Sequence, residues 1–237
     1  DISAISNWTI DGTNIYSDIS NSLDSATYSF AAGTSAGSNR DMDFQNAVGR
    51  NAGQFNAGSY QNAFGYLAGQ YNTGTGENAF GYFAGRHNTG TYQNAFGTSS
   101  GEINTGPYQN AFGFSAGTSN TGANQNAFGP YAGGSNIGDD QNAFGQQAGR
   151  FNTGDNQNAF GAFAGRFNTG DDQNAFGYFA GAYNQGYSNI SIGNSAGYSV
   201  QTTLSNPGDY NTWLNYRAGF AITEGNYNIG IGREAGD

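Results

Sequence analysis

The sequence is dominated by a 16-residue repeat that runs from Phe30 to Gly197 without a change of register. Written from its first residue, one copy reads N-A-F-G-x-x-A-G-x-x-N-T-G-x-x-Q, and these places are called positions 1 to 16 below. A short fixed period is typical of a solenoid, in which each unit packs mainly on its neighbours. The eleven copies begin at Phe30, Asn46, Asn62, Asn78, Asn94, Asn110, Asn126, Asn142, Asn158, Asn174 and Ile190.

The residues of the repeat favour turns and short extended segments. Glycine occupies positions 4 and 8 in every copy, and Asn-Thr-Gly recurs at positions 11 to 13. These residues lower helix stability, and glycine favours turns or close approach of two backbones. The sequence therefore predicts an all-β fold, a parallel β-solenoid (β-roll) of 16-residue coils without helix between residues 46 and 186. At about 4.8 Å per coil, eleven coils would span about 50 Å.

The apolar positions predict what fills each coil. Position 3 is phenylalanine in eight consecutive copies, from Phe64 to Phe176, and alanine predominates at positions 2 and 7. Because stacked phenyl rings bury a continuous apolar row, we predict that the Phe column lies inside a flattened, two-layered roll. The small Ala columns would let the two layers meet. The Asn columns are interpreted as turn residues or as amide ladders between coils.

Three regions are expected along the chain. Residues 1–29 lie outside the repeat, and an Asp-Gly turn between short apolar runs predicts a capping β-hairpin there. Residues 30–197 form the eleven-coil solenoid. Residues 198–237 contain an expected inserted loop at 200–210, and then two further copies at 212–219 and 228–236. Because the last copy is intact, we expect the native protein to continue past residue 237.

Composition excludes several classes of partner. The net charge is −10 and the chain has no lysine, so nothing resembles a basic stripe for a nucleic acid backbone. No basic amphipathic helix or bilayer-length apolar run is present, so membrane insertion is not expected. The chain has no cysteine, which rules out disulfides and fits an extracellular rod held by backbone ladders.

Titratable side chains give little sign of catalysis. His87 is the only histidine, and its column otherwise holds mostly aromatic residues, so we interpret it as a packing residue rather than a catalytic base. The acidic column formed by Asp139, Asp155 and Asp171 would place like charges roughly 5 Å apart in successive coils. Oxygen ligands of this kind suit Ca²⁺, and the alternative is a solvated acidic edge. No other cofactor is expected, and we predict that the protein is not an enzyme.

Positions 5 and 6 vary from copy to copy and are often aromatic. Tyr66, Tyr82, Phe163 and Tyr178 are candidates for a contact surface, because a thin core has no room for so many aromatic rings. Such a surface would serve contacts between chains or binding of a ligand such as a cell-surface receptor or glycan.

Two late copies carry a resemblance to a known family. The segments 189–197 (Asn-Ile-Ser-Ile-Gly-Asn-Ser-Ala-Gly) and 228–236 (Asn-Ile-Gly-Ile-Gly-Arg-Glu-Ala-Gly) resemble the head repeats of trimeric autotransporter adhesins and the N-x-A-I-G-x-x-A repeats of phage tail fibres. The central copies differ by Phe at position 3 and by their longer period. The resemblance implies a left-handed parallel β-roll in a homotrimer, located outside the cell on a virion fibre or a cell surface.

Two functions are therefore expected from the sequence. The first is a structural and adhesive fibre segment, a stiff spacer that also offers an attachment surface. The second is an ice-binding (antifreeze) β-solenoid, which would use the exposed row of threonines at position 12. Only one threonine occurs per coil, and Ile137 and Gln185 interrupt the row. The threonine row comprises Thr73, Thr89, Thr105, Thr121, Thr153 and Thr169.

Overall fold

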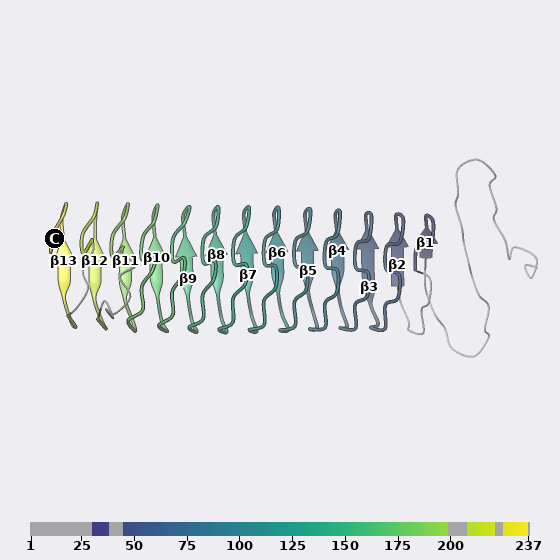
Figure 1. The fold of residues 1–237 in the computed structure, drawn as a ribbon, viewed down its shortest axis with the longest axis horizontal. Coiled ribbons are helices and arrows are strands. Elements are labelled where there is room, and N and C mark those ends of the chain that lie inside the picture. The colour runs from purple at the N-terminus through teal and green to yellow at the C-terminus, as the bar shows by residue number, and fades with distance from the viewer. Residues whose placement is uncertain (1–29, 38–44, 199–207, 221–224, 237) are drawn as a thin grey trace, which may run out of the picture.

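The computed structural model describes residues 30–37, 45–198, 208–220 and 225–236, which wind into one parallel β-solenoid (Figure 1). Thirteen strands form a single sheet in chain order, and each strand is hydrogen-bonded in parallel to the next. The capping hairpin expected in residues 1–29 lies outside the described residues, as does most of the loop expected at 200–210. The strands are β1 (Phe30–Ala32), β2 (Gln45–Val48), β3 (Gln61–Phe64), β4 (Asn78–Phe80), β5 (Asn94–Phe96), β6 (Asn110–Phe112), β7 (Asn126–Phe128), β8 (Asn142–Phe144), β9 (Asn158–Phe160), β10 (Asn174–Phe176), β11 (Ile190–Ile192), β12 (Thr212–Leu214) and β13 (Ile229–Ile231).

The strand register confirms the predicted repeat. Each strand starts at position 1 or one residue before it, and residues pair with their own copy in the next coil, as Asn94 does with Asn110. The register changes only after β11, where Ile190 pairs with Thr212, and after β12, where Thr212 pairs with Ile229. The two late copies predicted from the sequence are therefore genuine coils of the same sheet.

Hydrogen bonds join neighbouring coils well beyond the three-residue strands. In one coil, the backbone N–H groups of Gly97 and Ile103 donate to the preceding coil, with N–O distances of 2.9 Å. Those of Gly101 and Thr105 donate to the following coil at 2.8 and 2.9 Å. This alternation satisfies backbone polar groups in the turns as well as in the sheet. Most of the perimeter therefore resists separation of the coils.

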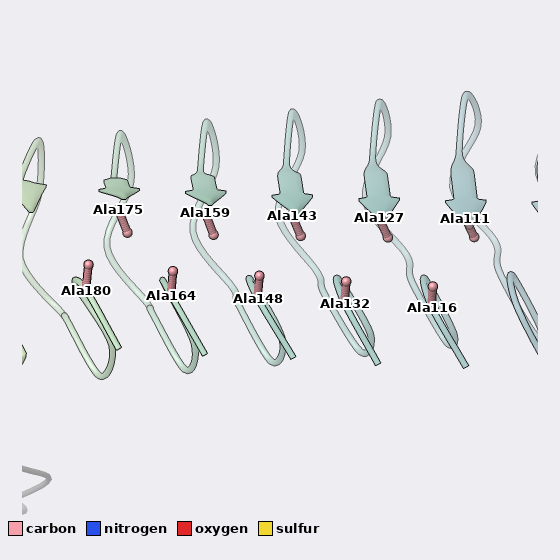
Figure 2. Packing of buried hydrophobic residues seen from close by; sticks show 10 residues of the cluster. All are labelled: Ala111, Ala116, Ala127, Ala132, Ala143, Ala148, Ala159, Ala164, Ala175 and Ala180. Atoms are coloured by element: carbon pink, nitrogen blue, oxygen red, sulfur yellow. The ribbon is translucent and has the colours of Figure 1, made fainter. Parts of the chain in front are cut away.

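The interior of the roll is built from alanine. Position 2 points inward from each strand and meets position 7 from the opposite layer, as Ala127 and Ala132 do in Figure 2. The Ala127 and Ala132 side chains are 2% and 0% exposed. The prediction of a thin, two-layered roll that is closed by Ala columns is confirmed.

The Phe column lies outside this core, so the prediction that its rings are interior was wrong. The three-residue strands β4 to β13 bury only their middle residue, and Phe160 and Phe176 remain 36% and 38% exposed. Side chains alternate between the two faces of a strand, so burial of position 2 places positions 1 and 3 outside. The rings still stack from coil to coil, with centroids 4.7–5.0 Å apart from Phe64 to Phe176.

A matched pair of substitutions tests this inversion of the core. We expect Ala127→Leu to destabilise the solenoid by about 1–3 kcal/mol, because overpacking forces the two layers apart. Phe128→Ala, next to it in β7, should cost less than the 3–5 kcal/mol typical of a buried phenylalanine, because one edge of the ring is already in water. Denaturant unfolding of both variants measures the difference. A larger loss for Phe128→Ala would contradict the assignment.

Candidate interaction surfaces

Amide ladders run along the rod at positions 1 and 11. At position 1, each Asn Nδ2 donates to the Oδ1 of the next copy from Asn46 to Asn174, with N–O distances of 2.7–3.0 Å. At position 11 the asparagines are buried, and the backbone N–H of Asn104 donates to Oδ1 of Asn88 at 2.8 Å. Bonding of the Asn columns from coil to coil is confirmed, but only the position 11 column is internal, as the ladders were expected to be.

The outer face of the sheet carries the position 1 and position 3 columns side by side, and is called the sheet face below. It runs from Asn46 to Phe176. Neighbouring Phe rings are nearly parallel, within 3–4°, so each ring covers the faces of its neighbours and turns an edge to solvent. A continuous apolar row of this kind indicates an interaction surface. Sequence reasoning missed it because the same residues also fit an interior ladder.

The four predicted contact residues form two local groups rather than one surface. Tyr66 stacks on Tyr82 with ring centroids 5.1 Å apart, and Phe163 meets Tyr178 edge-on at 5.9 Å. Tyr82 and Tyr178 are 48% and 50% exposed, whereas Tyr66 and Phe163 are partly buried. Several coils separate the two groups, so these residues could contact a partner only at two distinct heights of the rod.

The acidic column has a structural role that the sequence did not reveal. Asp155 Oδ1 accepts a hydrogen bond from the backbone N–H of Asp139 at 2.8 Å, and Asp171 Oδ1 accepts one from that of Asp155 at 2.9 Å. Asp139 Oδ1 does the same for the N–H of Ala123 at 2.7 Å. Each carboxylate therefore accepts a hydrogen bond from a backbone N–H group of the coil before it. Among the described residues, no group of three or more His, Cys, Asp or Glu side chains could hold a metal ion.

Positions 9 and 10 form an edge lined by stacked aromatic rings. His87 lies in this stack, with its ring 4.9 Å from that of Tyr71 and an interplanar angle of 5°, which confirms its interpretation as a packing residue. A second stack joins Phe151, Phe167 and Tyr183 at 4.9–5.0 Å. In both stacks the ring faces cover one another, so the edges form the outer surface.

Two arginines lie on the second stack. Arg150 packs its guanidinium 4.3 Å from the Phe151 ring centre, and Arg166 lies 4.4 Å from that of Phe167. The burial of Arg150 lowers its guanidinium pKa, and the charge of Arg166 acts in the same direction. The ion pairs within the described residues are Arg86–Glu102, Arg217–Glu234 and Arg233–Glu234, so neither Arg150 nor Arg166 meets a carboxylate there.

The threonine row points outward. Position 12 is exposed between buried residues at positions 11 and 13, as Thr105 is between Asn104 and Gly106. The backbone N–H of Thr105 donates to Asn120 O in the next coil at 2.9 Å, which holds successive copies in register. The position 10 column lies outside as well, but its side chains range from Ser119 to aromatic rings, so it does not supply a second regular rank.

One buried carboxyl group interrupts the position 16 column. The glutamines of this column are buried, and each donates its Nε2 to a glycine carbonyl of the next coil, as Gln93 does to Gly106 O at 2.9 Å. Glu77 takes the place of a glutamine, is 2% exposed, and neither carboxylate oxygen has a hydrogen-bond partner of normal geometry. Burial raises the Glu77 pKa well above its usual value, and the nearby Asn72 amide partly opposes this. The one break in the run of glutamines from Gln45 to Gln173 was the sequence signal.

Comparison with known proteins finds no matching family, no similar characterised protein and no similar solved structure. The described part of the chain has no helix that is long and apolar enough to cross a membrane. The function therefore has to be argued from the geometry of the solenoid and its surfaces.

Proposed function

We propose that this chain is a structural and adhesive fibre segment of a phage tail fibre or bacterial surface adhesin. It would act outside the cell as a stiff spacer and as an attachment surface. The observation that carries this proposal is the continuous stacking of thirteen parallel coils, bonded to one another around most of their perimeter. Thirteen coils at the strand spacing span about 60 Å. A rod of this kind transmits force along its axis through many backbone hydrogen bonds in parallel.

Self-association into a parallel homotrimer is part of the proposal. The sheet face supports it, because the Phe column presents an apolar edge in coil after coil, and an apolar row of that length favours burial against another chain. The resemblance of the late copies to fibre repeats points the same way and adds a left-handed winding. Exposed tyrosines such as Tyr82 and Tyr178 would remain available to a cell-surface receptor or glycan. No catalytic step and no cofactor are included.

An ice-binding solenoid is the second candidate. It is favoured by the exposed threonine row, whose members repeat at the coil spacing on one side of the rod. A regular binding plane would need a second rank, and the neighbouring position 10 column mixes serine, isoleucine, histidine and large aromatic side chains. The fibre function is therefore preferred.

Three measurements on the purified chain separate these functions. We expect electron microscopy to show rods at least about 60 Å long, sedimentation to give a trimer at micromolar concentration, and thermal hysteresis to be absent. Thermal hysteresis that disappears in a Thr89→Tyr, Thr105→Tyr double variant would establish ice binding instead. A Thr98→Tyr variant, changed at position 5 away from the threonine row, is the control. Globular particles or a stable monomer would contradict the fibre proposal.

A further inference from the structure

Two sets of unpaired charges lie at the same height of the rod. Arg150 and Arg166 occupy position 9 of the coils that begin at Asn142 and Asn158. The same two coils, and the coil before them, carry five carboxylates at positions 14 and 15. These are Asp139, Asp140, Asp155, Asp171 and Asp172, called the acidic edge below. Within the described residues, no ion pair joins the arginines to the acidic edge or involves any of its carboxylates.

The two arginines form a preorganised cationic site. Each guanidinium rests on a phenylalanine ring that is itself fixed in the stack of Phe151 and Phe167, and Arg166 Nε is buried without a hydrogen-bond partner. A planar guanidinium held in this way offers a bidentate match to a carboxylate. The two arginines repel one another in successive coils, which is unfavourable unless an anion faces them.

The acidic edge is equally well fixed. The Oδ1 atoms of Asp155 and Asp171 accept backbone N–H groups of the preceding coil. Asp172 Oδ1 accepts a hydrogen bond from Asn156 Nδ2 at 3.0 Å. One oxygen of each carboxylate is thereby anchored within its own chain. The other oxygen is not used by these bonds and can accept from outside.

We infer that a second, parallel copy of this chain docks its acidic edge onto Arg150 and Arg166, at the same coil height in both copies. The inference rests on the self-association in the proposed function and identifies the contact that sets its register. A rotation axis parallel to the rod leaves the height of every coil unchanged, so the arginines of one copy face Asp155 and Asp171 of the next. Because position 9 and positions 14–15 are different edges, the contact is head-to-tail around the axis and closes into a ring.

The charge pattern also explains why this contact is confined to the middle of the rod. At position 9 of the earlier coils, Arg86 already pairs with Glu102 of its own chain, at 2.6 Å. A carboxylate of another copy is not needed there. Arg86 is therefore a control residue, because it occupies the same position 9 column as Arg150 and Arg166 but is already paired.

Charge exchange tests the inference. Two double variants exchange the charges, one with Arg150→Glu and Arg166→Glu, the other with Asp155→Arg and Asp171→Arg. Sedimentation velocity of the full chain should give each of them a dissociation constant at least about tenfold higher than that of the wild type. Mixing these two double variants should restore association only in part, because two of the three contacts in a mixed trimer regain opposite charges. A quadruple variant that carries all four of these substitutions in one chain should self-associate like the wild type. The Arg86→Glu variant should associate like the wild type, and circular dichroism of every variant controls for folding.

The outcomes separate this contact from the spacer function. If both double variants associate as the wild type does, or if the exchange of all four charges within one chain restores nothing while the chain remains folded, the inference is wrong, and rods seen by electron microscopy would still support the fibre. A wild-type chain that stays monomeric at low ionic strength would overturn the docking. Association that weakens toward about 1 M salt, where the Debye length is about 3 Å, is the expected signature of the pairing.

Discussion

Replacing Gly106 by alanine is expected to destabilise the solenoid by about 3–5 kcal/mol, among the largest effects of any single substitution. Gly106 occupies position 13, where two successive coils approach most closely. A Cβ atom there would overlap the Gly122 carbonyl oxygen and lie 2.6 Å from its carbonyl carbon. Both are backbone atoms of the next coil, so relief requires separation of the coils and loss of the hydrogen bonds that join them.

Gly134→Ala is the matched control for this prediction. Gly134 is also buried, but it occupies position 9, where a new Cβ would have as its nearest neighbour the Thr118 hydroxyl oxygen at 3.3 Å. The flexible side chain can move aside, so the change should alter stability by less than about 1 kcal/mol. Thermal unfolding should show a loss of roughly 10 °C for Gly106→Ala and little change for Gly134→Ala. Equal effects would mean that position 13 is not a point of backbone contact.

The same close contact explains why the fold was readable from the sequence. Position 13 requires glycine where the coils stack this closely, and position 4 is constrained by its φ angle, 133° at Gly97. Position 8 is constrained by space, because a Cβ atom on Gly101 would lie 2.9 Å from the Ala95 Cβ. Such requirements recur in every coil, so they impose a strict period on the sequence. Coil length, strand position and register followed from that period.

The location of the core could not be predicted from the sequence, because alternation alone does not say which face of a strand is buried. In each strand, Ala at position 2 and Phe at position 3 both suit an interior. The choice depends on the spacing of the two layers, which is set by the opposite segment: its Ala at position 7 and Gly at position 8 bring the backbones close. In the described part, Ala127 is buried whereas Phe128 is not. Distances between remote segments of this kind are not encoded in a local pattern.

The turns contain a second feature that composition does not predict. Large side chains at positions 6, 10 and 15 adopt positive φ angles, for example Phe163 (60°), Phe167 (62°) and Tyr108 (57°). This conformation is uncommon for such residues. It persists here because the backbone N–H of each is bonded to the preceding coil, as Phe167 N is to Arg150 O at 2.9 Å. Stacking of neighbouring rings at the same positions adds to this, and neither contribution exists in an isolated coil.

For the candidate surfaces too, the sequence predicted which residues share a column but not what those residues contact. The acidic column was visible as a period in the sequence, but the capping of backbone N–H groups by Asp155 and Asp171 depends on the position of the preceding coil. The pairing state of Arg150 and Arg166 likewise depends on which edges they occupy. Periodicity therefore identified the residues that share a column, whereas their chemistry depended on the neighbours supplied by the fold.

Replacing Glu77 by glutamine is expected to stabilise the protein by about 3 kcal/mol at neutral or alkaline pH, because it removes a buried carboxyl group whose oxygens lack hydrogen-bond partners and which must keep a proton in the folded state. The new Nε2 can donate to Gly90 O, as Gln61 Nε2 donates to Gly74 O at 2.8 Å and Gln93 Nε2 to Gly106 O at 2.9 Å. The converse substitution, Gln109→Glu, places a carboxyl group in the same buried column and should destabilise the solenoid by a similar amount. Gln54→Glu, at a partly exposed position, is the control and should change stability little.

The stabilising effect of Glu77→Gln should increase with pH. Burial raises the pKa of Glu77 in the folded protein well above the ordinary value of 4.5, so the folded state holds a proton that the unfolded chain releases more easily. The protonated group contributes its full stability below about pH 4.5, and that contribution is lost as the pH rises toward the folded-state pKa. The stability difference between Glu77→Gln and the wild type should therefore be small at pH 4 and grow as the pH rises, which denaturant unfolding across that range can follow. A difference that stays constant with pH would show that Glu77 does not titrate with folding, and that its carboxyl group is solvated.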